Sequence, residues 1–572
     1  MKRKFFTPLN IPAPREPINQ GIDENNVLVQ EHNATYNRLL SSVTSENTLD
    51  KALVALDPFG TAPLSLYLGV WGDAEDELTI SVVDTLRTTY PITYQYPLEQ
   101  GRNLVPVSGL VAGVMNDVVL TTTLQESFRY QITTADLPPS DSAEVTLGFP
   151  IISVSYPIND EAKLGEGLYF STYFDRYNLA FDHNGTVRWY VSKDIPSYNF
   201  VRMGNGHFLA TSQGVNHCLN MYDFDIMGRV YTVYILDNEF HHSIFPLRNN
   251  LAVAPSEYSN GRPDEYSTGK DGVSIIDLTT GLEVAYYDML TVMDYSRTPR
   301  PSGSAPGQSD TMDDWLHINQ SYINETNNLL MSSGRHQSAV FGVDVDSAEL
   351  RFILATHEEW SEDFKQYLLT PVDESGNPLF DFSTQEGIDS ANNNFWTWGQ
   401  HNIVEIPNDQ TGIVEFLVFD NGNYRSRDDA KSLLPVDNFS RVVQFKIDLN
   451  TMTVFRAYEY GKDEVGGRGY SSYVSAKHLL DNGNVVIHFG ASTVDENDRP
   501  LSAQPGYSDI VDPQDGAQAL GILLLQEINK ESKQLLFEAT VTSGYYKNAQ
   551  QDGDDYRYDI SAFRVYKMPL FT

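Results

Sequence analysis

A β-hairpin pattern that recurs six times after residue 150 limits the folds open to this chain more than any other feature of its sequence. Each copy is an apolar strand, a turn that contains Asp or Asn, and a second apolar strand. The copies are NLAFDHNGTVRWYV, MYDFDIMGRVYTVYIL, VSIIDLTTGLEVAYYDM, VFGVDVDSAELRFIL, VVQFKIDLNTMTVFRAY and ILLLQEINKESKQLLFEA. The residues that mark their turns are Asp182, Asp225, Asp277, Asp346, Asp448 and Asn529. Such a repeat is typical of an array of similar β units.

A further turn and strand lies between these hairpins, as in GNGHFLATS, LRNNLAVAP, ETNNLLMSS and DNGNVVIHF. Hairpin and extra strands together give about four strands per repeat, in blades of about 45 residues or longer. The pattern therefore predicts an all-β fold, a six-bladed β-propeller. The uneven spacing of the repeats leaves two stacked β-sandwiches as the alternative. Residues 290–314 and 361–394 are expected to form loops at one rim.

The chain before residue 150 has a different character. Residues 1–50 are polar with four early prolines, and they are expected to form an arm or linker with one short helix. Residues 51–148 contain about five short alternating runs separated by turn residues, which is typical of a small β-sandwich. DLPPSDS, at residues 136–142, marks the boundary. We therefore expect an arm or linker at 1–50, an N-terminal β-sandwich domain at 51–148 and a propeller at 149–572.

Charge narrows the classes of partner. The chain has 77 acidic and 39 basic residues, a net charge of −38, which argues against nucleic acid and anionic membrane surfaces as partners.

No run approaches the roughly 20 apolar residues that span a bilayer. The first residues lack the apolar stretch of a signal peptide, so none is expected. The single cysteine, Cys218, rules out an intrachain disulfide framework and a cysteine-rich metal site.

Polar residues near the ends of predicted strands are the candidates for chemistry. They are His241, His242, His317, Asn319, Arg335 and His401. In a propeller, residues at such positions converge on the central channel. Histidines alone would suit a metal ion, but an arginine repels a cation and offers a planar fork to an oxyanion. The set therefore favours a sulfate or phosphate group that is transferred or cleaved, and no metal or cofactor is expected.

The other histidines are interpreted as structural residues, as most strand histidines are. They are His32, His183, His207, His217, His357, His478 and His488. His336 is placed with them, because strand alternation would turn its side chain away from that of Arg335.

Longer segments around the candidate residues resemble a known family. They are DWLHINQSYINETNNLLMSSGRHQSAVFGVD, QHNIVEI, FLVFDNGNYRS, FHHSIFPLRNN, DHNGTVRWYV and RNLVPVSGLVAGVMNDVVL. These segments are similar to the bacterial arylsulfate sulfotransferases, and the HxN motif followed by RHQSAV is specific to that family. The matching segments run from about residue 102 to 490.

The resemblance implies a six-bladed propeller with a small N-terminal β-sandwich, often found as a homodimer in the periplasm. It implies an enzyme that moves a sulfuryl group from a phenolic sulfate ester to a phenolic acceptor. The family works by a ping-pong route through a sulfated histidine and needs no adenylyl-sulfate donor. A phenolic sulfate and a phenol are therefore the expected partners.

The resemblance also implies a role for each candidate residue. His401 would be the nucleophile. His317, Asn319 and Arg335 would bind the sulfuryl oxygens. His242 would be the other central histidine, and His241 is the alternative to it.

The sequence departs from the family pattern at two positions. Gly334 precedes Arg335 where the family reads SSRHQ, and Ser243 stands where an Asp is common, which puts the orientation of His242 in question. The periplasm is expected from the resemblance alone, and the cytoplasm stays open as an alternative. Two other functions also stay open: a metal-dependent esterase or sulfatase-like hydrolase on a propeller, and a non-catalytic binding propeller.

Overall fold

The computed structural model describes most of the chain. The described residues are 21–86, 90–142, 145, 147–156, 161–173, 176–196, 198–211, 218–256, 272–300, 315–434, 437–495, 497, 518–544, 547–548 and 561–571. The expectations for residues 1–20, for the loop PSGSAPGQSD and for His217 lie outside them.

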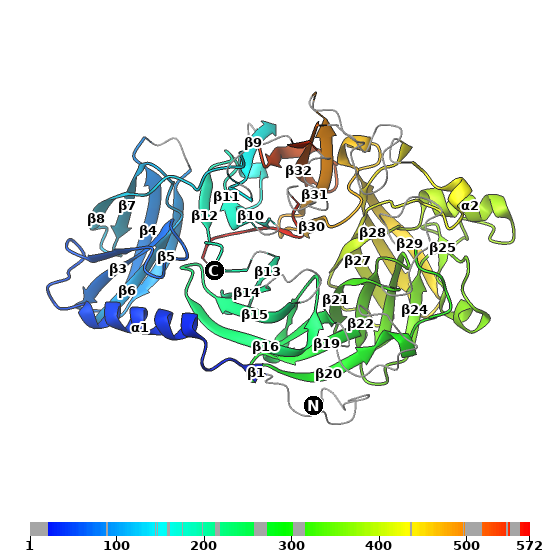
Figure 1. Ribbon diagram of the computed structural model, residues 1–572, viewed down its shortest axis with the longest axis horizontal. Helices are drawn as coiled ribbons and strands as arrows, with labels where there is room; N and C mark the ends of the chain where they lie inside the picture. The colour runs from blue at the N-terminus through cyan, green and yellow to red at the C-terminus, as the bar shows by residue number, and fades with distance from the viewer. Residues whose placement is uncertain are drawn as a thin grey trace.

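The N-terminal part contains a helix and two antiparallel sheets, which lie at the left of Figure 1. The first elements are β1 (Gly21–Ile22) and α1 (Val27–Ser42). One sheet has the order β2 (Leu53–Leu56), β3 (Ser65–Gly72), β6 (Gly101–Ser108). The other has the order β5 (Ile92–Leu98), β4 (Asp76–Asp84), β7 (Met115–Thr121), β8 (Ser127–Thr133). Apolar residues from both sheets share one core, as in a sandwich.

Helix α1 is 16 residues long and is capped by Asn26, whose side chain accepts a hydrogen bond from the Val29 N–H. The helix packs against a strand of the repeat region, because His32 Nδ1 accepts a hydrogen bond from the Val230 N–H at 2.9 Å. The Arg229 guanidinium lies 3.9 Å from the centre of the Tyr36 ring. His32 is therefore a packing residue, as the sequence indicated.

The rest of the chain is mostly β. Its strands up to residue 354 are β9 (Ile151–Tyr156), β10 (Leu168–Thr172), β11 (Asn178–Phe181), β12 (Val187–Tyr190), β13 (Asn199–Arg202), β14 (Phe208–Thr211), β15 (Cys218–Phe224), β16 (Val230–Phe240), β17 (Phe245–Leu247), β18 (Leu251–Ser256), β19 (Gly272–Asp277), β20 (Leu282–Asp288), β21 (Ile318–Asn324), β22 (Leu329–Gly334), β23 (Ala339–Asp344) and β24 (Leu350–Leu354). Those that follow are β25 (Thr370–Val372), β26 (His401–Glu405), β27 (Ile413–Asp420), β28 (Arg441–Asp448), β29 (Thr453–Tyr460), β30 (Ala476–Leu479), β31 (Asn484–Asp495), β32 (Gln518–Asn529), β33 (Leu535–Thr542), β34 (Lys547–Asn548) and β35 (Val565–Met568).

The predicted hairpins are confirmed as antiparallel pairs. They are β11–β12, β15–β16, β19–β20, β23–β24, β28–β29 and β32–β33. The intervening strands of the sequence pattern are also present, as β14, β18, β22 and β31. In Figure 1 the sheets follow one another through the colour series from cyan to orange.

Asp and Asn side chains close these turns by accepting backbone hydrogen bonds, as expected of Asx turns. Asp182 Oδ1 accepts from the N–H groups of Asn184 and Thr186 at 3.0 and 3.1 Å. One turn differs from the expectation. Asp344, and not Asp346, accepts the turn bonds there, from the Asp346 and Ser347 N–H groups.

The two ends of the repeat region join sheets that begin far away in the sequence. Strand β35, close to the C-terminus, pairs antiparallel with β10, so that Leu168 stands opposite Met568. Strand β9 pairs with β33 in the same way. The inner strands also contact one another between neighbouring sheets: β13 with β17, β17 with β21, β21 with β26, β26 with β30, and β30 with β35.

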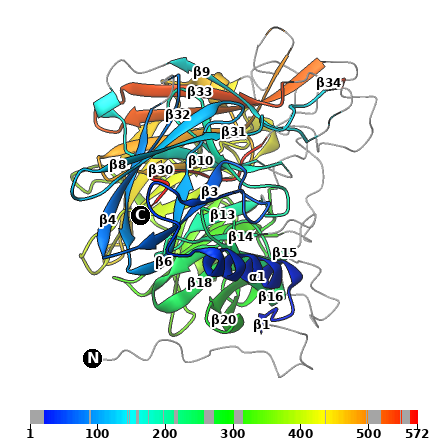
Figure 2. The ribbon, with the colours of Figure 1, turned by 90° about the vertical axis from the view of Figure 1, so that its left-hand side faces the viewer.

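The N-terminal sheets are fastened to the repeat region by a buried arginine. Arg188 on β12 donates hydrogen bonds to the carbonyl groups of Gly109, Tyr90 and Val82, at 2.9, 2.7 and 3.3 Å. Figure 2 shows the sandwich from the side that faces away from the rest of the molecule. The two parts therefore share polar contacts as well as an apolar core.

Residues 361–394, expected to be a loop, contain regular structure. Strand β25 runs parallel to β29, and α2 (Gln385–Asn394) follows. Helix α2 begins where the Thr384 side chain accepts a hydrogen bond from the Gly387 N–H. Short 3₁₀ helices occupy Glu161–Lys163, Arg248–Asn250, Met289–Thr291, Glu362–Tyr367, Asp429–Lys431 and Gly466–Gly469.

Candidate active site

The candidate residues come from strand ends, as the sequence predicted. His241 and His242 follow β16, His317 precedes β21, Asn319 lies in β21, Arg335 follows β22, and His401 begins β26. His242 is half-buried and the other five are buried, with at most 8% of the residue surface exposed. The structure gathers them into two groups, a chain of histidines and the surroundings of His401.

The histidine chain is defined as His241, His242, His317 and His336. His242 connects its neighbours: its Nδ1 lies 2.7 Å from His241 Nδ1, and its Nε2 lies 3.0 Å from His317 Nε2. His242 is thus the member of the pair that contacts His317, and His241 lies behind it, with its ring 6.4 Å from that of His317.

His336 does not turn away from the site, which corrects the expectation for this residue. Its ring centre lies 4.4 Å from that of His317. Arg335 to Ser338 form the turn after β22 and not a strand, so strand alternation does not apply to them.

The backbone at two members of the chain is held in the left-handed region. His242 has a φ of 63° and His317 a φ of 52°. Residues other than glycine occupy this region at a cost of about 1–2 kcal/mol each. Surrounding contacts must hold these conformations in place, such as the hydrogen bond of 3.1 Å from the Arg335 N–H to the His317 carbonyl.

His401 has one ring nitrogen fixed by two acceptors. Its Nδ1 lies 2.8 Å from Asn421 Oδ1 and 3.1 Å from the Gly399 carbonyl oxygen. The Asn421 amide cannot be turned round without loss, because its Nδ2 donates to the Ser471 carbonyl at 2.8 Å and the Val474 carbonyl at 3.3 Å. Two acceptors require a proton on Nδ1. The lone pair of neutral His401 is therefore on Nε2.

The surroundings of His401 also keep the ring neutral. Burial is the main cause of a His401 pKa well below 6.5, and the positive charge of Arg335 is the next. The hydrogen bond to Asn421 acts in the opposite direction, while His317 and Arg564 lower the pKa further. A buried, neutral imidazole with a free lone pair on a known atom can act as a nucleophile.

Hydrogen bonds with residues of the neighbouring sheet fix the segment before His401, which is Gly399 and Gln400. Asn319 Nδ2 donates to the Gln400 carbonyl at 2.7 Å, and the Gly399 N–H donates to Ser338 Oγ at 3.1 Å. One of the two Asn319 side-chain N–H groups is therefore used to hold the His401 segment. This positioning contact was not part of the expectation for Asn319.

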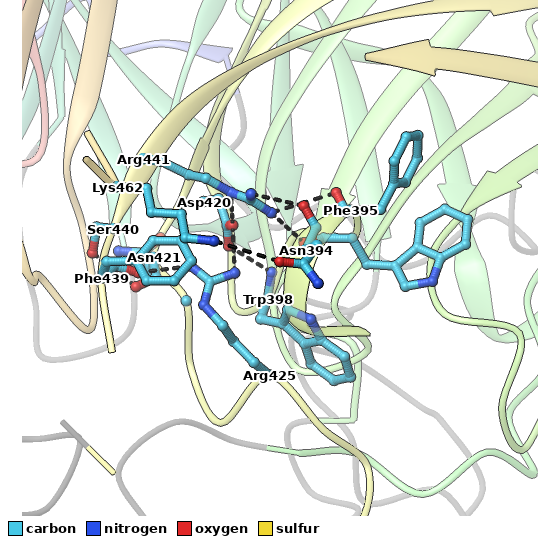
Figure 3. A network of polar contacts seen from close by, with 12 residues as sticks. Asn394, Phe395, Trp398, Asp420, Asn421, Arg425, Phe439, Ser440, Arg441 and Lys462 are labelled. Carbon is cyan, nitrogen blue, oxygen red and sulfur yellow. Dashed lines mark hydrogen bonds and ion pairs between the residues drawn. The ribbon is translucent and has the colours of Figure 1, made fainter. Parts of the chain in front are cut away.

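A buried cluster of ion pairs around Asp420 holds the backbone just before this segment, at Trp398 (Figure 3). Asp420 Oδ1 accepts from the Trp398 N–H at 2.8 Å. Asp420 Oδ2 accepts from Arg425 Nη1 at 3.0 Å and from Arg441 Nε at 2.8 Å. Because Asp420 directly precedes Asn421, the cluster fixes both the loop before His401 and the acceptor of its Nδ1 proton.

Asn421 is a site residue that the sequence reasoning missed. It lies in the segment FLVFDNGNYRS, which carries part of the family resemblance, but the strand pattern gave no reason to separate it from its neighbours. Arg335 donates from Nη2 to the Ser472 carbonyl at 3.3 Å, so the same loop, residues 471–474, contacts both Asn421 and Arg335.

The two departures from the family pattern have local explanations. Ser243 Oγ donates to the Asn319 carbonyl at 3.1 Å, so Ser243 fastens the histidine pair to β21. At Gly334 a side chain would collide with Leu316, the residue before His317. Glycine therefore permits the close approach of the β22 end to the His317 backbone.

Most of the histidines interpreted as structural have ordinary partners. His357 Nε2 lies 2.9 Å from the Leu369 carbonyl oxygen, and His488 Nε2 lies 2.7 Å from that of Ala562. His478 Nδ1 accepts from the Lys567 N–H at 3.0 Å. His207 Nδ1 lies 2.8 Å from Asp223 Oδ1. These contacts fit packing and turn roles.

Among the residues that the structure describes, no three His, Cys, Asp or Glu side chains are placed so that they could hold a metal ion together. In the described part of the chain, no helix has the length and apolar character needed to cross a membrane.

Known proteins resemble this chain in sequence. Arylsulfate sulfotransferase AssT from Escherichia coli is 23% identical over 525 residues, which cover 77% of this chain and 84% of that protein. The protein of the same name from Lelliottia amnigena is 22% identical over 512 residues, covering 75% and 82%. Among solved structures, the periplasmic gluconolactonase PpgL of Pseudomonas aeruginosa matches with 9% identity and a TM-score of 0.28, over 87% of this chain and 100% of that one.

Family models match both parts of the chain. The model described as "Arylsulfotransferase Ig-like domain" matches residues 53–137, within the N-terminal sheets. The model described as "Arylsulfotransferase (ASST)" matches residues 154–554, more than half of the chain. The enzyme class expected from the sequence is thereby confirmed. The chain belongs to the arylsulfotransferase family.

Proposed function

We propose that this protein transfers a sulfuryl group from a phenolic sulfate ester to a phenolic acceptor through a sulfohistidine formed at His401 Nε2. The observation that carries the proposal is the pair of acceptors at His401 Nδ1, Asn421 Oδ1 and the Gly399 carbonyl, which leaves the lone pair on the other ring nitrogen. A nucleophile needs such a lone pair in the ground state, without prior loss of a proton.

In the first half-reaction, His401 Nε2 attacks the sulfur atom of the donor. The new N–S bond forms while the S–O bond to the aryl group breaks, and the electron pair of that bond leaves with the phenolate oxygen. The proton on Nδ1 stays in place, so the ring becomes positively charged next to the bound SO₃ group. Asn421 Oδ1 and the Gly399 carbonyl then face this charge at hydrogen-bond distance.

Arg335, Asn319 and His317 are proposed to bind the sulfuryl oxygens. The transition state of such a transfer is loose by analogy with phosphoryl transfer, and charge grows on the equatorial and leaving oxygens. Donors fixed in advance stabilise this charge by roughly 3 kcal/mol each in other enzymes. Arg335 lies close enough to His401 to depress its pKa, which supports its place beside the sulfuryl group.

The histidine chain is proposed to supply and recover the proton of the phenol. His242 lies between His241 and His317 through nitrogen–nitrogen contacts of 2.7 and 3.0 Å. In each contact one nitrogen donates and the other accepts, and both directions satisfy the chain. Reversing the direction moves a proton from one end of the chain to the other. The same residues can therefore protonate a leaving phenolate and later deprotonate an acceptor phenol.

Tyr198 and Phe563 are proposed to hold the aromatic ring of the substrate. Their rings stack with a centroid distance of 5.4 Å, and the Phe563 ring lies 5.5 Å from that of His242. Aromatic surfaces next to the reacting group bind flat phenols and exclude water, which favours transfer over hydrolysis.

We further infer that the repeats form a six-bladed propeller at residues 149–572, after an arm at 1–50 and a sandwich at 51–148. Support comes from the six hairpins, from the contacts between successive inner strands, and from the pairing of β35 with β10. A periplasmic location and a homodimer are proposed on the family resemblance alone. Sedimentation of the purified protein tests the dimer, and fractionation of cells that express it tests the location.

The activity is tested by release of nitrophenolate from 4-nitrophenyl sulfate in the presence of a chelator, with and without phenol. Transfer predicts steady release only with phenol, and without it a single burst of about one equivalent per active site, as expected for a covalent intermediate. Steady release without phenol would instead indicate a sulfatase. Release that the chelator abolishes would favour the metal-dependent hydrolase, and no release at all would favour a binding propeller.

A further inference from the structure

A second group of buried cations lies next to the proposed site, and the proposed function does not use it. We define the inner belt as Gln320 on β21, Asn402 on β26, Lys477 on β30 and Arg564, which directly precedes β35. All four residues are at most 4% exposed. Strands β21 and β26 also supply Asn319 and His401, β30 contacts β26, and β35 pairs with β10.

Hydrogen bonds connect the inner belt into one unit. Gln320 Oε1 accepts from Arg564 Nη2 and from Asn402 Nδ2, both at 3.0 Å. Asn402 Oδ1 accepts from the backbone N–H of Lys477 at 2.8 Å. Neutral amides thus hold the backbone and the guanidinium in place, but they bring no negative charge.

The two cations of the inner belt have no carboxylate partner within the described residues. Arg564 donates to Gln320, to the Phe563 carbonyl at 2.9 Å and to the Asn319 carbonyl at 3.5 Å, all of them neutral. Lys477 Nζ is buried and makes no hydrogen bond there. Burial lowers the pKa of Arg564 to about 10, and burial together with the charge of Arg564 holds the pKa of Lys477 well below 10.5. A buried charge without a partner is strongly disfavoured.

The neighbouring strand shows how the same chain treats a buried lysine elsewhere. Lys567 on β35 lies 2.6 Å from Glu527 Oε2 and donates to Tyr169 Oη at 3.1 Å. Lys477 is as deeply buried and lacks such a partner among the described residues. The contrast points to a negative charge that the inner belt obtains from outside the polypeptide.

We propose that a small inorganic anion, of the size of a halide or a sulfate ion, binds between Arg564 and Lys477 in the inner belt. The anion supplies the negative charge that Glu527 supplies to Lys567. This site goes beyond the sulfuryl pocket of the proposed function and does not depend on it, because Arg335 and His401 are not part of the inner belt.

The test compares thermal unfolding of the full-length protein in sodium gluconate, whose anion is too bulky for the site, with unfolding in increasing sodium bromide or sodium sulfate at fixed ionic strength. The variants are Lys477→Met, which keeps the length of the side chain without its charge, and Lys567→Met as the matched control. A ligand that binds the folded state raises its stability with the logarithm of concentration above Kd.

We expect Lys477→Met to unfold at a higher temperature than the wild type in gluconate, because it removes an uncompensated charge. The difference should vanish or reverse as the anion is added, because only the wild type gains from binding at the inner belt. Lys567→Met should unfold at a lower temperature than the wild type in every buffer. Its unfolding temperature should rise with anion concentration in parallel with that of the wild type. The bromide and sulfate series show whether the site takes a halide or an oxyanion.

Parallel responses of wild type and Lys477→Met would overturn the proposal, and would indicate a neutral Lys477. A loss of stability in Lys477→Met in gluconate as large as that of Lys567→Met would also overturn it. Arg335→Gln separates the inner belt from the sulfuryl pocket, because it should lose only the part of the sulfate response that arises in that pocket and should keep the response that Lys477→Met loses. A response lost in Arg335→Gln and kept in Lys477→Met would assign the ion to the sulfuryl pocket instead. In crystals soaked in bromide, the anomalous peak should lie beside Lys477 Nζ.

Discussion

His401 and the histidine chain are both built from imidazoles that are buried or, at His242, half-buried, but their hydrogen bonds differ in kind. The fixed ring nitrogen of His401 faces two oxygen acceptors, so one tautomer is selected. His242 meets other imidazole nitrogens on both sides, so its contacts can be satisfied in two directions. Oxygen acceptors thus fix a lone pair, whereas imidazole partners leave the proton free to move. The proposed division, with nucleophilic attack by His401 and proton transfer by the chain, rests on this difference, and each experiment below tests one side of it.

The largest effect is expected from His401→Asn. Removal of the nucleophile should lower donor cleavage by roughly 10⁴-fold or more and abolish covalent labelling by a ³⁵S-labelled aryl sulfate. The matched control is His488→Asn, which changes another buried histidine with a carbonyl partner and should still be labelled. Full labelling of His401→Asn would show that the nucleophile is another residue, and would end the comparison in its present form.

Arg335→Gln should have the next largest effect, a loss of roughly 10²–10³-fold in kcat/KM for the donor, because a fixed charge-stabilising donor is removed. Arg335→Lys should recover only part of the rate, since lysine keeps the charge but not the planar fork. Rapid-quench measurement of both half-reactions checks this prediction, because the same donors bind the sulfuryl group in each of them. A defect confined to one half-reaction would contradict this place for Arg335.

His242→Asn should act through the leaving group. Loss of proton transfer should slow cleavage of phenyl sulfate by roughly 10–10²-fold, because its poor leaving group needs a proton. The release of 4-nitrophenolate, a much weaker base, should change little. A plot of log kcat/KM against leaving-group pKa should therefore be steeper in the variant than in the wild type. An equal loss for all donors would mean that His242 only packs the site, which is what His357→Asn should show as a control.

Asn421→Asp tests the selection of the tautomer. The substitution keeps an oxygen acceptor for His401 Nδ1, but adds a negative charge and removes the donors to the Ser471 and Val474 carbonyls. The charge should raise the His401 pKa, so that activity falls by about tenfold at pH 6 and less at pH 8. Rates measured from pH 6 to pH 8 distinguish the effect of the added charge, which depends on pH, from the effect of the lost hydrogen bonds. A loss that is the same at every pH would indicate disturbed packing of the loop instead.

The smallest effect is expected in the wild-type pH profile. Because the pKa of His401 is lowered in the folded protein, its neutral form persists below pH 6.5. An ordinary histidine would lose about fourfold in neutral form between pH 8 and pH 6. The kcat/KM for 4-nitrophenyl sulfate should instead change by less than about twofold over this range, as expected of a group that stays neutral. A fall in kcat/KM as the pH drops below about 6.5 would indicate that the ionisation of a solvent-accessible histidine controls the rate.

The parts of the fold that could be predicted from the sequence depend on short-range patterns. Strand alternation and Asx turns act within a few residues, so all six hairpins were predictable. The one turn placed wrongly contains two aspartates, and the bonds go to Asp344 instead of Asp346 because only Asp344 has the turn N–H groups ahead of it. Helix α2 was missed because its capping residue stands in a polar stretch with no apolar period.

The residues of the site that escaped prediction act over long range. Asn421 contacts the loop at Ser471, 50 residues away in sequence, and no local pattern encodes such a pair. His336 was misplaced because the strand ends one residue before Arg335, and the turn brings the ring back to His317. The candidate residues themselves could be singled out because they differ in chemistry from the apolar strands that carry them.

The pairing of β35 with β10 has a consequence for how the protein is made. Strand β10 of the first sheet is synthesised early, but its partner β35 is synthesised only after the sheets that lie between them in the sequence. Arg564 arrives at the same moment, since it directly precedes that strand. The first sheet therefore stays incomplete until the sheets between β10 and β35 have been synthesised, and a chain truncated before residue 564 would lack both β35 and a cation of the inner belt. Completion of the first sheet and completion of the inner belt are then a single event.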